Sequence, residues 1–178
     1  MKVEQTPIPG VLKITTEPVK DERGAFARLV CTNEMAATGT PFSPVQVNLS
    51  SNIKAGTLRG LHFQTPPHEE EKLVQVTAGR IWDVAVDIRP GETFGKWFGT
   101  DLSRENGVAL YLPKGIAHGF ITLEDNTDVL YHMGQAFVPG HGAGIRWNDP
   151  DIAIQWPREP VVINERDATY PGIASLKS

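Results

Sequence analysis

Hydrophobic and polar residues alternate in the middle of the chain with the two-residue period of β-strands. In the segment 81–88, one face would carry Trp82, Val84, Val86 and Ile88, and the other Asp83, Ala85 and Asp87. Further segments of β-type composition stand between glycine, proline and asparagine turn signals: 72–76, 108–112, 120–123 and 129–133. Ala78-Gly79, which separates 72–76 from 81–88, predicts a hairpin turn.

Helical periodicity is nearly absent from the sequence. The segment from Thr32 to Ala37 predicts one short capped helix. Many short strands joined by glycine- and proline-containing turns are typical of an antiparallel sandwich or barrel. We therefore expect an all-β protein with few short helices. Its 178 residues correspond to about one domain, which we expect to span 1–178.

Composition and charge narrow the choice of partners. The chain is 40% hydrophobic and 21% charged, with a formal net charge of −4, which is ordinary for a globular protein. Because this charge is mildly negative, we expect neither a nucleic acid nor a membrane surface as partner. The apolar runs are too short to span a membrane, and residues 1–6 lack the apolar segment of a signal peptide. We expect a cytoplasmic protein.

Several kinds of site have no support in the sequence. The single cysteine, Cys31, excludes an internal disulfide framework. The five histidines show no spacing typical of metal ligands, so we expect no metal. The glycine-rich segment 140–144 is not followed by a helical pattern, which favours a loop over a nucleotide-binding turn. We expect no cofactor.

Hydrogen-bonding side chains are concentrated in the segment 46–64. They are Gln46, Asn48, Arg59, His62 and Gln64. So many polar groups inside a barrel would be costly unless they face a ligand or one another. Strict alternation places His62 and Arg59 on opposite faces, whereas a bulge or twist at Gly60 would bring both into one pocket.

Three aromatic or imidazole side chains each have two interpretations. A lone histidine in a strand, such as His62, is more often structural than catalytic. Tyr131 fits either a core position with a satisfied hydroxyl or a site residue, and His118 fits either a histidine bonded within its own loop or a ligand contact. The residues alone leave these alternatives open.

A series of motifs is similar in content and order to one known family. They are D-E-R-G at 21–24, L-R-G-L-H-F-Q at 58–64, K-L-V at 72–74, D-V-A-V-D-I-R at 83–89, T-F-G-K-W at 93–97, L-P-K-G-I-A-H-G-F at 112–120, I-R-W-N-D-P at 145–150 and I-Q-W-P at 154–157. On these motifs the chain resembles the dTDP-4-dehydrorhamnose 3,5-epimerase family over about residues 11–171. The resemblance implies a metal-free cupin jelly-roll barrel and a homodimer that exchanges N-terminal strands.

The resemblance also implies an activity on a nucleoside-diphosphate 4-keto-6-deoxyhexose. The C4 ketone acidifies the hydrogens at C3 and C5, so a base removes one and leaves an enolate, and an acid on the opposite face returns a proton. The centre is thereby inverted at C3, while inversion at C5 stays open. Such a sugar would supply a surface polysaccharide or glycoconjugate. The alternatives are a 3,4-ketoisomerase, which returns the proton elsewhere, and a non-catalytic sugar-nucleotide binding module.

Roles for individual residues follow from the resemblance, position by position. The implied catalytic residues are His62 as base, Asp167 as its orienting carboxylate, Lys72 beside the enolate oxygen and Tyr131 as acid. The implied diphosphate and sugar contacts are Arg23, Gln46, Asn48, Arg59 and His118. Phe26 and Phe137 would enclose the nucleobase, because stacking requires only aromatic rings.

Three positions depart from the family pattern. Arg28 and Gly142 stand where the family usually has glutamate, and Phe137 stands where it usually has tyrosine. A guanidinium would suit the N3 acceptor of cytosine better than the N3–H donor of thymine, so Arg28 suggests a different nucleobase. The alternative is that Arg28 points to solvent or forms a salt bridge across the dimer.

Overall fold

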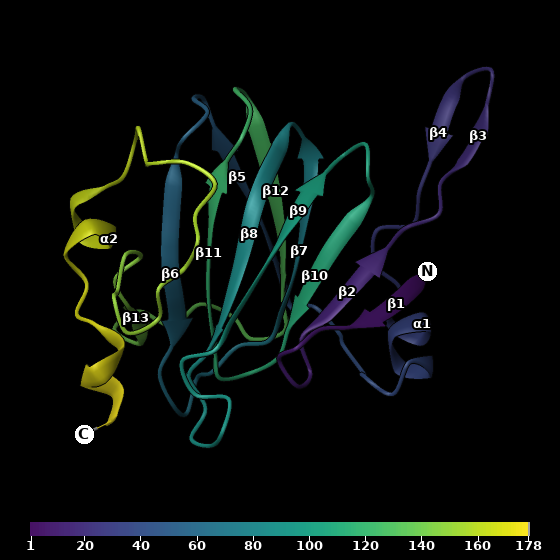
Figure 1. Cartoon of the computed structure of the whole chain (residues 1–178). Helices are drawn as coiled ribbons and strands as arrows, with labels where there is room; N and C mark the ends of the chain where they lie inside the picture. The colour runs from purple at the N-terminus through teal and green to yellow at the C-terminus, as the bar shows by residue number, and fades with distance from the viewer. Residues whose placement is uncertain (178) are drawn as a thin grey trace.

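Two antiparallel sheets make up most of the molecule (Figure 1). The computed structural model describes residues 1–177, so Ser178 of the expected domain lies outside the described residues. In spatial order, the six-stranded sheet contains β1 (Lys2–Gln5), β2 (Leu12–Thr15), β10 (Val108–Leu112), β7 (Lys72–Ala78), β12 (Thr127–Met133) and β5 (Gln46–Asn52). The five-stranded sheet contains β13 (Gly142–Gly144), β6 (Leu58–Gln64), β11 (Ile116–Thr122), β8 (Arg80–Asp87) and β9 (Trp97–Ser103). The all-β expectation is confirmed.

The main core lies between the sheets because apolar side chains alternate onto their facing surfaces. Val74 and Leu110 from one sheet pack with Ala85 and Phe120 from the other in one buried cluster. Strand β10 has the predicted bounds, and the other predicted strands are found with ends that differ by a few residues. The N-terminal strands β1 and β2 were not predicted, because each has only four residues, too few for a clear periodic pattern.

The predicted hairpin at Ala78-Gly79 is wrong. Strands β7 and β8 follow one another directly, but they belong to different sheets. Gly79 has a φ of +72°, and a Cβ there would lie 2.3 Å from the Thr127 hydroxyl. The glycine therefore forms a tight corner that leads from one sheet to the other, and a local turn signal does not distinguish this corner from a hairpin.

Strand β8 has the two faces that its alternation predicts, but the polar face is turned inward. Ala85 belongs to the core between the sheets, and Asp83 and Asp87 share its face with exposures of 0%. Val84 and Val86 instead lie on the outer surface of the five-stranded sheet, in a second apolar cluster with residues of the C-terminal segment such as Ile152.

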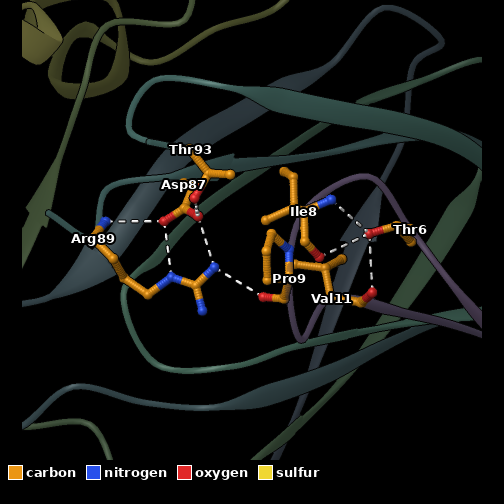
Figure 2. A network of polar contacts seen from close by, with 7 residues as sticks. All are labelled: Thr6, Ile8, Pro9, Val11, Asp87, Arg89 and Thr93. Atoms are coloured by element: carbon orange, nitrogen blue, oxygen red, sulfur yellow. Dashed lines mark hydrogen bonds and ion pairs between the residues drawn. The ribbon is translucent and has the colours of Figure 1, made fainter. Parts of the chain in front are cut away.

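A polar network ties the start of the chain to the β8–β9 loop (Figure 2). Asp87 accepts hydrogen bonds from the Arg89 guanidinium on both carboxylate oxygens, at 2.9 and 2.7 Å, and from the Thr93 hydroxyl at 2.7 Å. Arg89 also donates to the carbonyl oxygen of Pro9 at 2.8 Å. In the same turn, the Thr6 hydroxyl donates to the Val11 carbonyl at 2.9 Å. This network fixes the N-terminal turn against the sheets.

Strands β3 (Val19–Asp21) and β4 (Gly24–Phe26) form a separate two-stranded hairpin that projects beyond the two large sheets (Figure 1). Helix α1 (Thr32–Ala37) has the predicted bounds, and Met35 packs it against the outer face of the six-stranded sheet. Near the C-terminus lie α2 (Glu165–Thr169) and the 3-10 helix η1 (Ile173–Lys177). No helix within residues 1–177 has the length and hydrophobicity needed to cross a membrane.

Candidate active site

A cavity of about 560 Å³ takes side chains from both sheets. Of the predicted site residues, it is lined by Gln46, Asn48, Arg59, His62, Lys72, His118, Tyr131 and Phe137. His62 stands on β6 and His118 on β11 of the five-stranded sheet, whereas Lys72 stands on β7 and Tyr131 on β12 of the six-stranded sheet. Residues separated along the sequence thus line one cavity.

A bulge in β6 brings Arg59 and His62 into this cavity. In the pairing of β6 with β11, His62 lies opposite His118 and Arg59 lies opposite Phe120. Between these two pairs, β6 therefore contains one residue more than β11. Gly60 makes the bulge possible because its φ is +134° and a Cβ there would lie 2.5 Å from the Gly119 Cα. Of the two arrangements that the sequence left open, strict alternation or a bulge or twist at Gly60, the structure has the bulge.

The half-buried His62 side chain pairs with the buried carboxylate of Asp167. Its Nε2 lies 2.8 Å from Asp167 Oδ1, and Asp167 Oδ2 accepts the Gly60 N–H at 3.0 Å. Burial by itself would raise the pKa of Asp167, but the hydrogen bonds from His62 and Gly60 outweigh it and hold that pKa below its ordinary value. Because a carboxylate only accepts, His62 Nε2 carries a hydrogen, and in the neutral form of the ring Nδ1 keeps its lone pair.

Lys72 is held by a neighbouring carboxylate inside the cavity wall. Its Nζ lies 2.6 Å from Glu70 Oε1, and both side chains are 5% exposed. The other carboxylate oxygen of Glu70 accepts the Gln64 N–H of β6 at 2.8 Å. An ammonium group has three hydrogens, so this contact leaves Lys72 two donors for a ligand.

Tyr131 faces the cavity without a hydrogen bond from its hydroxyl to any described residue. Its ring packs edge to face on His118, with centroids 5.9 Å apart. Burial raises the pKa of the Tyr131 hydroxyl above its usual range, and the negative charge of Asp83 raises it further. Tyr131 is therefore a protonated phenol near neutral pH, as a proton donor must be.

Three further polar side chains and the Phe137 ring also belong to the cavity wall. Arg59 donates through Nε to Asn52 Oδ1 at 2.8 Å, which leaves the two terminal nitrogens of its fork for a ligand. Gln46 donates to Asn48 Oδ1 at 3.0 Å and accepts the Phe137 N–H at 3.1 Å. The Phe137 side chain is well exposed, so its ring is available for stacking.

The N-terminal candidates are not brought to this cavity. Arg23, Phe26 and Arg28 belong to the projecting hairpin and the segment after it, and none of them lines the cavity. Arg23 pairs with Asp21 inside the hairpin, and Phe26 is 79% exposed. Arg28 forms a salt bridge with Glu34 of its own chain, rather than pointing freely into solvent.

Four charged or aromatic residues of the cavity wall were not predicted from the sequence: Phe63, Glu70, Arg166 and Tyr170. Arg166 and Tyr170 lie in or beside α2, which is too short to give a periodic signal. The Tyr170 ring packs edge to face on His62 with centroids 5.9 Å apart. The signal for Glu70 was its place two residues before Lys72, although Glu69-Glu70-Glu71 resembles an ordinary solvated acidic run. Within residues 1–177, no group of three or more histidine, cysteine, aspartate or glutamate side chains is arranged to hold a metal ion.

The two facing sheets and the polar cavity between them define a jelly-roll barrel equipped for acid–base chemistry. Comparison with known proteins narrows this class. The dTDP-4-dehydrorhamnose 3,5-epimerase family profile matches residues 5–175. This chain belongs to that family and is an isomerase-class enzyme with the cupin jelly-roll fold.

Individual relatives agree with this assignment. The dTDP-4-dehydrorhamnose 3,5-epimerase of Escherichia coli (strain K12) is 43% identical over 185 aligned positions, which cover 99% of this chain and 98% of the relative. The crystal structure of the Bacillus anthracis enzyme with TDP and PPi bound has a TM-score of 0.93 at 38% identity, covering 96% of this chain and 98% of that one. The structure of a Legionella pneumophila epimerase in complex with dTDP-4-keto-L-rhamnose has a TM-score of 0.92 at 36% identity. The match covers 98% of this chain and 96% of that one.

Proposed function

We propose that the protein inverts C3, and C5 as well, of a dTDP-4-keto-6-deoxyhexose through an enolate. The observation that carries this proposal is the placement of His62 and Tyr131 on facing sheets around one cavity that also contains Lys72. A base and an acid on opposite sides of a bound ring are what an inversion requires, because the proton must return to the face opposite the one it left.

Each catalytic residue has one chemical task in this proposal. His62 Nδ1 removes the proton from the carbon beside the ketone, and the electron pair moves to the C4 oxygen. A hydrogen of the Lys72 ammonium bonds that oxygen as its negative charge develops. Tyr131 then gives its phenol proton to the opposite face of the carbon. Asp167 stays ionised and stabilises the imidazolium that His62 becomes. Exchange with water restores both groups.

The nucleotide would be held by cations and an aromatic ring. Arg59 and Arg166 both line the cavity, and a guanidinium fork fits phosphate oxygens in pairs. Phe137, at the cavity wall, would stack on the base. We propose thymidine as the nucleoside, in keeping with the names of the relatives, because Glu34 already occupies the guanidinium of Arg28 and removes the argument for cytosine.

We further propose a homodimer in which the N-terminal hairpin of each copy reaches the other copy. The hairpin pairs with no other strand among residues 1–177, and its Phe26 and Val19 are 79% and 72% exposed. In such a dimer, Arg23 and Phe26 would complete the nucleotide site of the second subunit. We propose that this enzyme works in the cytoplasm as a single domain, without nucleic acid or membrane, and serves the synthesis of a surface polysaccharide or glycoconjugate.

The test is incubation of the protein in heavy water with dTDP-4-keto-6-deoxyglucose, followed by proton NMR. Deuterium incorporation at C3 and C5 together with inversion of both centres is the expected result. A 3-keto product would instead identify a 3,4-ketoisomerase. Binding of the substrate without any deuterium incorporation would identify a non-catalytic binding module and contradict the proposed function.

A further inference from the structure

Asp83 is a fully buried carboxylate that the proposed chemistry does not use. It lies on the inward face of β8, diagonally across from His118 on the neighbouring strand β11, where its direct partner is Phe120. Its Oδ1 lies 2.7 Å from His118 Nε2, and both side chains are almost completely buried. A second histidine–aspartate pair therefore stands in the barrel besides His62 and Asp167.

The two inward aspartates of β8 differ in how their oxygens are used. Asp87 has hydrogen bonds on both carboxylate oxygens, as expected of a carboxylate that stabilises the fold. Asp83 has only the bond to His118, and its Oδ2 is sealed from solvent without a partner among the described residues. An unpaired buried carboxylate oxygen is costly. A contribution to stability therefore does not explain why position 83 is an aspartate. The hydrogen bond between Asp83 and His118 offers an explanation.

The hydrogen bond between the two residues determines what His118 presents to the cavity. A carboxylate only accepts, so the bonded Nε2 must carry a hydrogen. The other nitrogen, Nδ1, bonds to no described residue, and the ring lines the cavity beside Tyr131. In a neutral imidazole with hydrogen on Nε2, Nδ1 has a lone pair and accepts hydrogen bonds. Such an acceptor suits a sugar hydroxyl, which has a hydrogen to donate.

We propose that Asp83 is a positioning residue, which fixes His118 with an acceptor nitrogen toward the cavity and thereby selects a hexose with a hydroxyl at that point. This inference rests on the proposed function, since it concerns how the same cavity holds its sugar. The inference concerns the hexose and not the diphosphate, because phosphate oxygens only accept hydrogen bonds and therefore do not pair with an acceptor nitrogen.

The variant Asp83→Asn tests the proposal because it changes hydrogen-bond polarity at nearly constant size. With its oxygen toward His118, the asparagine would bury an NH₂ group at the unpartnered Oδ2 position. Turned the other way, its NH₂ donates to His118 Nε2, which moves the ring hydrogen to Nδ1. The second arrangement leaves fewer unpaired donors, so the cavity-facing nitrogen becomes a donor and loses the sugar hydroxyl.

Three measurements decide the proposal. Long-range proton–nitrogen NMR of the labelled free protein should show His118 of the wild type with hydrogen on Nε2, and Asp83→Asn should show it on Nδ1. For Asp83→Asn, the KM for dTDP-4-keto-6-deoxyglucose should rise about tenfold, the usual value of one hydrogen bond. The Kd for dTDP, which lacks the hexose, should stay within about twofold of the wild type.

Asp87→Asn is the matched control, since it places the same change on the same face of β8, away from the cavity. It should lower thermal stability without changing KM or Kd. Hydrogen on Nδ1 of His118 in the wild type would overturn the proposal, as would an unchanged KM or an equal weakening of dTDP binding in Asp83→Asn. If the wild type bound dTDP but gave no epimerisation, the proposed function would fail. The NMR result on the free protein would still decide the inference separately.

Discussion

The Nε2 atom of His62 lies 2.8 Å from Oδ1 of Asp167, although 105 residues separate the two along the chain. His62 comes from the bulged strand β6, and Asp167 comes from the short helix α2. The Gly60 N–H, at the bulge itself, donates to the other oxygen of the same carboxylate at 3.0 Å. One carboxylate thus both orients the proposed base and fixes the backbone that presents it.

Replacement of His62 by alanine should lower turnover by about 10²- to 10⁴-fold, the usual contribution of a general base. Deuterium incorporation should fall with it, while the Kd for dTDP should change little, because His62 acts on the hexose. Steady-state kinetics, NMR in heavy water and calorimetric titration would measure the three quantities. His68→Ala is the control, since the His68 side chain does not line the cavity. Unchanged turnover in His62→Ala would refute its role as base.

Tyr131→Phe should separate the two proton transfers. Removal of the phenol proton leaves the base intact, so deuterium should still enter at the carbon beside the ketone while inversion is suppressed more strongly. Proton NMR of the recovered sugar reports both events in one sample. Tyr111→Phe serves as control, because Tyr111 lies outside the cavity and bonds to Glu71. Equal losses of exchange and inversion in Tyr131→Phe would contradict its role as acid.

Lys72 and Glu70 should show strong coupling in stability but not in catalysis. Lys72→Met leaves the buried Glu70 carboxylate unpaired, which should cost about 3–5 kcal/mol of unfolding free energy. The double variant Lys72→Met/Glu70→Gln should recover most of that stability, yet both variants should lose about 10²- to 10³-fold in turnover. Denaturant unfolding and kinetics on the single and double variants provide the comparison. Recovery of turnover in the double variant would show that Lys72 does not act on the enolate.

Acid should destabilise the fold partly through Asp87. Burial by itself would raise the pKa of Asp87, but hydrogen bonds from Arg89 and Thr93 hold it below its ordinary value of 3.8. A lowered native pKa stabilises the fold above pH 3.8, and this contribution is lost as the pH falls below 3.8 through the native value. Guanidinium unfolding between pH 7 and about pH 3 would measure the loss.

The variant Asp87→Asn removes this titration and also breaks the network of Figure 2. It should cost about 2–4 kcal/mol at pH 7, below the value for a fully buried pair because Arg89 is 34% exposed. Its stability should then fall less steeply with acid than that of the wild type. Asp101→Asn, which breaks an exposed pair with Arg80, is the control and should cost less than about 1 kcal/mol. If the unfolding free energy of Asp87→Asn fell with decreasing pH as steeply as that of the wild type, this account would be refuted.

The nucleobase preference should be for thymine, with dTDP binding at least about tenfold more tightly than CDP. Calorimetric titration of the two diphosphates measures the ratio directly. Because Arg28 is paired with Glu34, Arg28→Gln should leave that ratio unchanged. A preference for CDP in the wild type that Arg28→Gln abolishes would restore the interpretation in which this guanidinium reads cytosine.

The sequence by itself determined the class of fold, the local elements with clear periods and the residue types at the site. The alternation of 81–88, the strand 108–112 and the helix 32–37 are all encoded by neighbouring residues, whose side-chain period and turn signals do not depend on distant contacts. The motif around His62 also carried the family resemblance, which the comparisons confirmed.

Only the tertiary structure decided how these parts meet. The same turn signal at Gly79 fits a hairpin or a corner between sheets, and the choice depends on the close approach of Thr127. Strict alternation would place Arg59 and His62 on opposite faces of β6. The extra residue of β6 in its pairing with β11 brings both side chains to the cavity. Asp83 meets His118 because β8 and β11 are neighbouring strands, and Asp167 meets His62 because α2 packs beside β6. These contacts are set by packing across the whole barrel, because burial is shared among residues that no local pattern connects.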